Sequence, residues 1–159
     1  MKKFFKAASL MLICATFTGI VSCSDDKKEE PKTPEAAKEV AGTYTGDIDC
    51  YVMGTLYTTY TNNTFIITAE DEDDVTIKMP AYGEGNMMFP EITVTDVDVE
   101  GTDGKYTLEE TNFAGSFESG TAYTGSIGGK FENNTLTLNF SYAIGAMPPM
   151  TCVFTAPKN

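Results

Sequence analysis

AYTGSIGGKFENNTLTLNFSY, residues 122–142, is the stretch that decides the fold. Apolar side chains alternate with small or polar ones on both sides of Asn133-Asn134, and this period of two places successive side chains on opposite faces of a β-strand. Two asparagines between such runs favour a tight hairpin turn. The stretch therefore predicts two antiparallel strands that share one apolar face, formed by Tyr123, Ile127, Phe131, Leu136, Leu138, Phe140 and Tyr142.

The same alternation recurs from Gly42 to the C-terminus, bounded by Gly, Pro, Asn and Asp, and no stretch there has helical periodicity. A change of apolar parity between Val94 and Val97 predicts a β-bulge. The acidic run Glu70–Asp74 predicts a loop. We expect eight strands, over residues 43–52, 56–69, 75–79, 91–99, about 106–108, 122–131, 136–142 and 150–155.

Sequential antiparallel strands, each with one apolar face and most joined by short turns, predict an all-β domain that closes as an eight-stranded up-and-down barrel. A two-sheet sandwich is the alternative. Closure would place the first strand beside the last, and Cys50 and Cys152 lie on the apolar faces of those two strands. In an exported protein such a pair favours a disulfide, and two buried thiols acting as small apolar side chains are the other interpretation.

The N-terminus has the pattern of a lipoprotein signal peptide. Three lysines within the first six residues precede the apolar stretch 7–21, which is short for a membrane-spanning helix, and the stretch ends in IVSC at residues 20–23. We predict that residues 1–22 are removed and that Cys23 carries the lipid that anchors the chain to a membrane. Residues 23–41 would then form a charged tether, and residues 42–159 the barrel domain.

The residues directly after Cys23, Ser24–Glu30 (SDDKKEE), resemble the short acidic export signal of Bacteroidota lipoproteins. This resemblance implies a lipid-anchored protein of the outer membrane that faces the cell exterior. A solvated tether, whose charges and prolines prevent folding, accounts for the same residues, and both interpretations can hold together.

The composition limits the chemistry that the chain can perform. The full sequence has a formal net charge of −12 and contains no Arg, His or Trp. Without residues 1–22, eight lysines remain against 23 acidic residues, which gives −15. Such a surface repels nucleic acid and anionic membranes. The chain also lacks the usual anion clamp, the neutral-pH proton shuttle and the commonest metal ligand, so we expect no nucleic-acid partner, no cofactor and no metal.

Four segments resemble the calycin-like domain of Bacteroidota lipoproteins. They are Ala41–Gly46 (AGTYTG), Phe89–Val94 (FPEITV), Asn134–Leu138 (NTLTL) and Gly145–Pro148 (GAMP), within a similarity that covers residues 41–156. The resemblance implies a calycin-like barrel related in shape to lipocalins, fatty-acid-binding proteins and avidin. It implies no established activity, and no binding or catalytic residue carries over from it.

Two loops carry apolar side chains that could line a barrel mouth. These side chains are Tyr82, Met87, Met88 and Phe89 in the first loop and Met147 and Met150 in the second. Methionine adapts to varied partners, so the loops could rim a site for a small hydrophobic ligand, a glycan or a protein. The alternative is that they fold over one end of the barrel and plug its core.

Acidic residues offer two further candidate sites. The run Glu70–Asp74 could supply oxygen ligands for calcium, but it lacks the spacing and the glycine of a calcium-binding loop and is more typical of a solvated turn. Asp47 with Asp49, and Glu109 with Glu110, could serve acid–base chemistry, but the pattern places neither pair in a sheltered site. We therefore predict a non-enzymatic cell-surface binding or envelope-interaction module, with a carboxylate-dependent hydrolase as the alternative.

Overall fold

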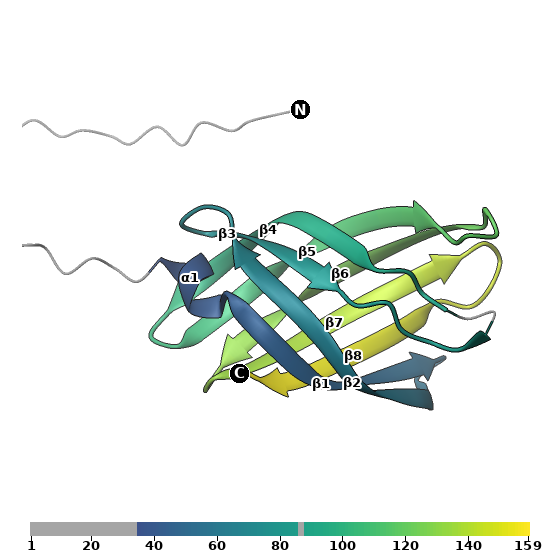
Figure 1. The fold of residues 1–159 in the computed structure, drawn as a ribbon, viewed down its shortest axis with the longest axis horizontal. Coiled ribbons are helices and arrows are strands. Elements are labelled where there is room, and N and C mark those ends of the chain that lie inside the picture. Colours follow the sequence, from purple (N-terminus) through teal and green to yellow (C-terminus); the bar gives the residue numbers. More distant parts are fainter. Residues whose placement is uncertain (1–34, 86–87) are drawn as a thin grey trace, which may run out of the picture. The chain divides into compact units, whose positions relative to one another are not determined.

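The computed structural model describes residues 35–85 and 88–159, and these residues form a β-barrel with one short helix (Figure 1). Each strand pairs antiparallel with the next, and β8 pairs with β1, so the sheet closes. The eight-stranded up-and-down barrel is confirmed, and the two-sheet sandwich is excluded. The strands are β1 Gly42–Val52, β2 Thr55–Ala69, β3 Asp74–Met79, β4 Ile92–Thr102, β5 Lys105–Ser116, β6 Ala122–Glu132, β7 Thr135–Ile144 and β8 Met150–Pro157.

The β6–β7 hairpin forms as its sequence predicts. Phe131 lies opposite Leu136, and the ladder continues without a slip to the ends of both strands. Asn133 and Asn134 have positive φ angles of 52° and 61°, the backbone conformation of the two-residue turn that matches the twist of paired strands. A slip of one residue would turn the apolar face outward, so burial of that face fixes the register.

The predicted bulge in β4 is confirmed. Val75 lies opposite Val97 but Ile77 lies opposite Val94, so β4 carries one residue more than β3 between these pairs. Asp96 takes the positive φ angle of 56° within this bulge. The extra residue restores the inward direction of the apolar side chains on both sides of it.

Strand β5 is longer than predicted because a second bulge hides its continuation. The register with β6 slips between Leu108 and Thr111, and Phe113 then points inward again. A side chain at Gly128 would place its Cβ 3.0 Å from the Glu110 Cα, so the bulge packs closely against this glycine on the neighbouring strand. In the sequence this bulge breaks the alternation, so only the segment around residues 106–108 is predicted as strand.

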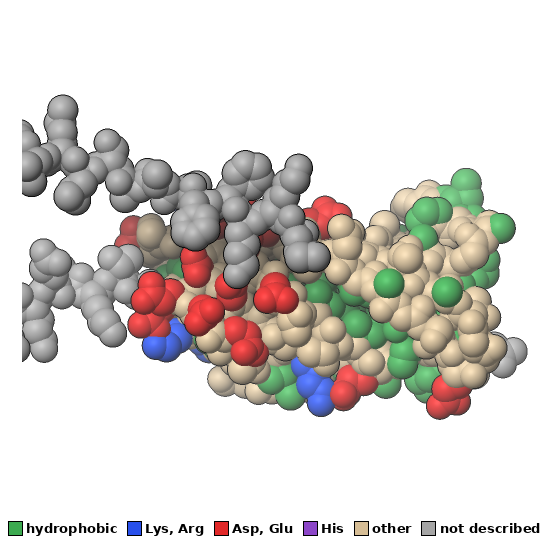
Figure 2. All heavy atoms as spheres, turned by 90° about the horizontal axis from the view of Figure 1, so that it is seen from above, with side chains coloured by type: hydrophobic (Ala, Val, Ile, Leu, Met, Phe, Trp, Pro, Cys, Tyr) green, Lys and Arg blue, Asp and Glu red, His purple; other side chains and the backbone are tan. Residues whose placement is uncertain are grey.

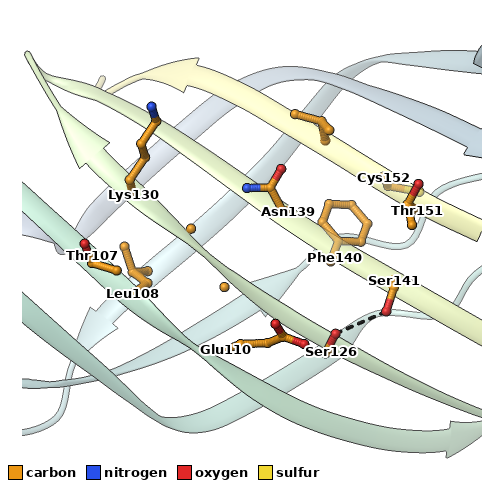
Figure 3. Close-up of a pocket in the computed structure, with 13 residues that line it drawn as sticks. Thr107, Leu108, Glu110, Ser126, Lys130, Asn139, Phe140, Ser141, Thr151 and Cys152 are labelled. Atoms are coloured by element: carbon orange, nitrogen blue, oxygen red, sulfur yellow. Dashed lines mark hydrogen bonds between the residues drawn. The ribbon is translucent and has the colours of Figure 1, made fainter. Parts of the chain in front are cut away.

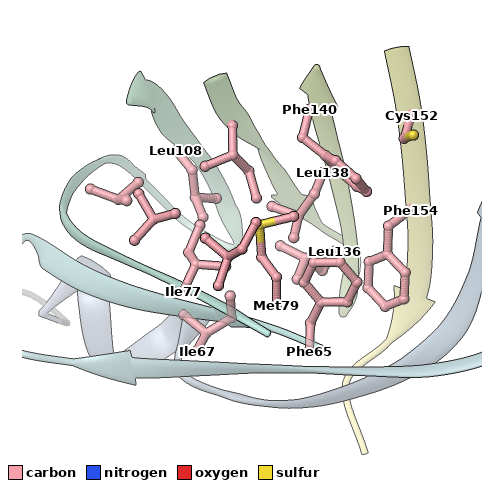
Figure 4. Packing of buried hydrophobic residues seen from close by; sticks show 14 of the residues in the cluster. Phe65, Ile67, Ile77, Met79, Leu108, Leu136, Leu138, Phe140, Cys152 and Phe154 are labelled. Carbon is pink, nitrogen blue, oxygen red and sulfur yellow. The ribbon is translucent and has the colours of Figure 1, made fainter. Parts of the chain in front are cut away.

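Side chains from all eight strands pack into one core inside the barrel (Figure 4). The Phe65 and Phe154 rings lie 4.2 Å apart between centroids, and both side chains are fully buried. Burial of each such ring stabilises the fold by about 1.5–3 kcal/mol. An eight-stranded barrel is narrow enough for side chains to fill, and large ones are fully buried here, among them Tyr44, Ile48, Ile77, Met79, Leu136, Leu138 and Tyr142.

Helix α1, Ala36–Val40, packs against the barrel end at which the chain enters. Ala37 and Val40 are fully buried, and the Ala37 N–H donates to the Glu72 carbonyl at 3.1 Å. The Tyr44 hydroxyl donates to the Val40 carbonyl at 2.5 Å. These five residues, expected to belong to the solvated tether, are therefore part of the barrel, because their small apolar side chains are covered there.

The predicted signal peptide, the lipidated Cys23 and the first part of the tether lie outside the described residues. Among the residues that are described, no helix is both long and apolar enough to cross a membrane.

Candidate binding surfaces

The described parts of the connection between β3 and β4, residues 80–85 and 88–91, form a strap at the barrel end opposite α1, which we call the distal end. Pro80 has no N–H to donate, so it ends the β3 ladder. Tyr82 and Phe89 then pair with each other. The Tyr82 N–H donates to the Phe89 carbonyl at 3.2 Å, and the Phe89 N–H donates to the Tyr82 carbonyl at 2.7 Å. This bridge holds the two aromatic side chains next to one another.

Both aromatic side chains of the strap enter the mouth of the barrel. Tyr82 is 4% exposed and Phe89 is 1% exposed. Their rings stack at 5.1 Å, and the Phe89 ring lies 4.4 Å from that of Tyr142 on β7. Of the two interpretations of this loop, the plug is therefore the one that the fold adopts. Met150 is buried below it, Met88 and Met147 are about half exposed beside it, and Met87 lies outside the described residues.

One polar atom under the plug lacks a hydrogen-bond partner, while the Tyr82 hydroxyl lies 3.9 Å from the Cys152 sulfur and interacts with it. The Tyr142 hydroxyl is buried and makes no hydrogen bond to the described residues, although the Tyr82 hydroxyl lies near enough to affect its titration. Burial is the main cause that raises the pKa of both tyrosines above the ordinary value. Both phenols therefore stay protonated near neutral pH and cannot serve there as general bases.

Cys50 and Cys152 lie side by side at the seam where β1 meets β8. They are direct partners in the register, and their sulfur atoms are 2.7 Å apart. Both are buried free thiols, and the neighbouring Cys50 thiol together with burial raises the pKa of Cys152. Barrel closure thus brings Cys50 and Cys152 together, as the sequence predicts. The bond between them stays a prediction.

Exposed large apolar side chains gather at the distal end. Figure 2 shows hydrophobic side chains concentrated toward that end and most acidic ones toward the other. A hollow of about 420 Å³ lies at this end, lined in part by Met88, Phe117 and Glu118. We call the exposed set the distal rim, and it consists of Met53, Leu56, Tyr57, Met88 and Met147.

A second hollow, of about 690 Å³, lies on the outer face of β5 to β8 (Figure 3). Ser126 and Ser141 line it, with their hydroxyl oxygens 3.1 Å apart, and Gly128 contributes no side chain. Lys130 and Glu110 are the charged groups in its lining. The sequence analysis missed this groove, because it interprets glycine in a strand as a bend and because the groove arises only where several strands lie together.

The described acidic residues form no sheltered site. Of all polar and charged residues that the structure describes, only Asn63 is buried. No described carboxylate therefore lines the interior. No group of three or more acidic or cysteine side chains in the described residues is arranged to hold a metal ion. The outward Asp49 accepts a hydrogen bond from the Thr59 hydroxyl at 2.6 Å, and Asp47 accepts one from the Asn62 N–H at 3.2 Å.

One acidic pair escaped the sequence analysis. Asp74 on β3 lies directly opposite Asp98 on β4. A hydrogen bond with Asp98, followed by burial and the charges of Asp98, Asp73 and Asp71, raises the pKa of Asp74 to about 6. The two carboxyl groups therefore share a proton at mildly acidic pH. Only the pairing of β3 with β4 brings them together, since 24 positions separate them in the sequence.

Asp74→Asn is expected to stabilise the barrel at pH 7 and to leave its stability unchanged at about pH 4. The folded-state pKa of about 6 exceeds the unfolded value near 4, so the folded chain holds an extra proton between these values, and that stabilisation is lost as the pH rises through 6. Water screens this exposed pair, so the gain at pH 7 should be less than about 1 kcal/mol. Urea unfolding at several pH values measures it.

The matched control for this pH dependence is Asp103→Asn in the β4–β5 turn, which removes one negative charge away from the Asp74–Asp98 pair. It should keep the pH dependence of the unaltered chain. A difference between Asp74→Asn and the unaltered chain that does not change with pH would refute the shared proton.

Residues 40–156 match the profile of the calycin-like β-barrel domain. The chain belongs to this family. The match covers the whole calycin-like barrel from the end of α1 to β8, as the resemblance in the sequence implies. A comparison with curated proteins finds no match.

The calycin-like barrel is also similar to a solved structure from Bacteroides fragilis, described as a "putative outer membrane protein". The two share 26% sequence identity and a TM-score of 0.63, over 79% of this chain and 53% of that chain. The chain thus spans about half the length of that protein. The likeness is consistent with an outer-membrane location, and together with the family it fits a binding module.

Proposed function

We propose that this calycin-like barrel is a non-enzymatic binding module of a lipid-anchored outer-membrane protein, displayed at the cell surface, and that it binds a protein through the distal rim. The observation that carries the proposal is that Tyr82 and Phe89 fill the barrel mouth while Met88 and Met147 stay exposed beside it. A filled mouth leaves recognition to the outer surface. Exposed apolar clusters of this kind mark contacts with other proteins.

The place where the chain enters the barrel supports binding through the distal rim. The chain enters the barrel at α1, at the end opposite the distal rim, so an N-terminal lipid on Cys23 leaves the rim free for a partner. The likeness to the outer-membrane protein supports the location, and the sequence Ser24–Glu30 supports display on the outer side.

No specific observation favours the alternative of a carboxylate-dependent hydrolase. That mechanism needs two facing acids in a sheltered pocket, where burial can raise the pKa of one of them. Asp74 and Asp98 do face each other, but neither side chain is buried and neither is among the lining residues of the hollows described above.

Cys23→Ala is expected to abolish palmitate labelling and to release the protein from the membrane fraction of its own cells. The acyl chains on this residue supply the membrane affinity, at about 0.8 kcal/mol for each buried methylene. Ser24→Ala is the matched control and should keep both the label and the membrane location. Persistent labelling of the Cys23→Ala protein would show that the anchor lies elsewhere.

A photo-reactive amino acid placed at Met88 or at Met147 of the full-length protein is expected to form a discrete cross-link to another protein on intact cells. The control position is Asn133, which is exposed in the β6–β7 turn at the opposite end of the barrel. A product at the rim and none at Asn133 supports the proposal. Equal products at the two ends, no product at the rim, or a small molecule that co-purifies inside the barrel in native mass spectrometry would contradict it.

A further inference from the structure

Much of strand β2 has a neighbour on one side only. β2 has 15 residues and β3 has six, and the two strands pair only from Ile66 to Ala69. Pro80 ends β3, and the strap then turns into the barrel mouth instead of continuing along the wall. From Thr55 to Phe65, β2 therefore pairs with β1 alone, and no other strand of the described residues covers its second edge.

An open edge of this kind presents backbone N–H and C=O groups that can pair with another strand. Proteins usually protect such edges with lysine, proline or bulges. Over its whole length β2 contains no charged residue and no proline. Its register with β1 slips near Tyr57 and near Asn62, where φ is 60°, and these bulges bend the strand without adding charge. Bending is therefore the only one of these protections that the edge has.

Exposed apolar side chains concentrate on the same strand. Of the six large hydrophobic residues that are exposed in the described chain, Leu56, Tyr57 and Ile66 lie on β2 and Met53 lies in the turn that leads into it. Leu56 and Tyr57 lie on the unpaired part of the edge, Met53 lies directly before it, and Ile66 lies where β2 already pairs with β3. Single exposed apolar residues are ordinary, but neighbouring ones on an open edge mark a contact surface. In Figure 1 the β1–β2 turn lies at the end of the barrel away from α1.

The edge carries no charge, so a second copy of the chain can pair with it without like-charge repulsion. The acidic run Glu70–Asp74 follows the far end of β2, twelve residues beyond Thr58, or about 40 Å along a strand. Antiparallel pairing of two β2 edges would send the acidic runs to opposite ends of the pair, far beyond the screening distance of about 8 Å at physiological salt. The nearer carboxylates are Asp47 and Asp49, which lie one strand inward and are hydrogen-bonded within their own chain, and Glu84 of the strap, whose charge reaches Tyr60.

We propose that the β2 edge from Thr55 to Thr61 docks against the same edge of a second copy, so that two barrels join through an antiparallel β2–β2 pair around a twofold axis. The segment lies between Gly54 and Asn62, which both have positive φ. The contact is isologous, so each copy pairs the open edge of the other from Thr55 to Thr61. It goes beyond the proposed function, because it uses the backbone edge of β2. The two surfaces share Leu56 and Tyr57, and Met88 and Met147 belong to the distal rim alone.

The dimer should be of moderate affinity in solution. One pair of strands with a few side chains buries less than the roughly 1,600 Å² of a standard interface. We therefore expect a dissociation constant on the order of micromolar, and stronger pairing when two anchored copies share one membrane.

The test uses full-length protein expressed in its own cells with two different epitope tags, so that one tagged copy can be precipitated through the other. Thr55 and Thr61 are exposed, and in a pair whose twofold axis passes near Thr58, Thr55 of one copy lies opposite Thr61 of the other. Replacing both by lysine in one variant, or both by glutamate in another, then puts like charges opposite each other. Each variant alone should lose self-association at least tenfold. Coexpression of the lysine variant with the glutamate variant should restore it as a mixed pair.

The matched control replaces Thr151 and Thr155 by lysine, because these threonines are exposed on β8, which has neighbours on both sides. That variant should pair like the unaltered chain, and circular dichroism of all variants should show the same folded barrel. The proposal is overturned if the unaltered chain does not self-associate, if the lysine variant pairs as well as the unaltered chain, if the mixed pair is not restored, or if the edge binds a different protein instead. The photo-reactive amino acid at Met147, placed in the lysine variant, tests the proposed function separately, because it detects a partner protein at the distal rim whether or not the β2 edges pair.

Discussion

Oxidation of Cys50 and Cys152 is expected to raise the free energy of unfolding by about 4–5 kcal/mol. The two residues are 102 positions apart in the sequence and 2.7 Å apart between sulfurs, so a bond would close a very long loop of the unfolded chain while the paired strands already hold the partners together. Urea unfolding with and without a reductant measures the difference. Mass spectrometry after thiol alkylation in urea counts the free thiols in protein taken from its own cells.

The control for this prediction is the double variant Cys50→Ala with Cys152→Ala, whose unfolding should not respond to the reductant. Its stability should resemble that of the reduced chain, less the small cost of the lost apolar volume. Two alkylated thiols in the unaltered chain from its own cells, at positions 50 and 152, would show that the pair stays reduced and that the thiols serve as small apolar side chains.

Phe89→Ala is expected to lower the free energy of unfolding by about 3–5 kcal/mol. The Phe89 ring is buried between Tyr82, Phe117 and Tyr142, so its removal deletes apolar contacts and leaves a hole in the plugged mouth. An apolar hole of this kind stays dry and takes up small apolar molecules. Benzene should therefore bind to the variant and restore part of the lost stability, which urea unfolding with and without benzene would measure.

Met88→Ala is the matched control, because Met88 is the preceding residue of the strap and its side chain is half exposed. A surface change of this kind should alter stability by about 0.5 kcal/mol or less, without any benefit from benzene. If Phe89→Ala costs no more than Met88→Ala, the strap does not plug the barrel in solution, and the proposal of a rim-binding module loses the observation that carries it.

The plug and the open β2 edge have the same structural cause. β3 stops at Met79 because Pro80 follows, and the chain then carries Tyr82 and Phe89 into the mouth instead of running beside β2. The same departure fills the interior and uncovers the edge of the neighbouring strand. Recognition by this barrel is therefore expected on its outside, at the distal rim and along β2.

Local pattern predicted the strands well where the alternation is unbroken. In β7 every second residue from Leu136 is apolar and buried, and the prediction is confirmed. In β5 the bulge at Glu109 and Glu110 breaks the alternation, so the strand beyond it could not be predicted. Helix α1 has only five residues, which is too short for a helical periodicity to be recognised in the sequence.

The sequence predicted which residues belong to the candidate site, but it could not predict how they are arranged. Tyr82, Phe89 and Met88 stand close together in the loop, yet whether each faces the core or the solvent depends on the Tyr82–Phe89 bridge and on Tyr142 from a distant strand. The groove beside Ser126 and the Asp74–Asp98 pair likewise need neighbouring strands to exist.

The sequence by itself determined most of the strands and their apolar faces, because the alternation of period two and the turn residues act over a few neighbouring positions. It favoured the closed barrel and left a two-sheet sandwich as the alternative. It also determined which two cysteines would meet, since closure of eight sequential strands joins the first to the last. Only the tertiary structure decided that the mouth is plugged, that α1 packs on the barrel and that β2 keeps an open edge. These features depend on contacts between residues far apart in the chain and on unequal strand lengths, and no local pattern records either of them.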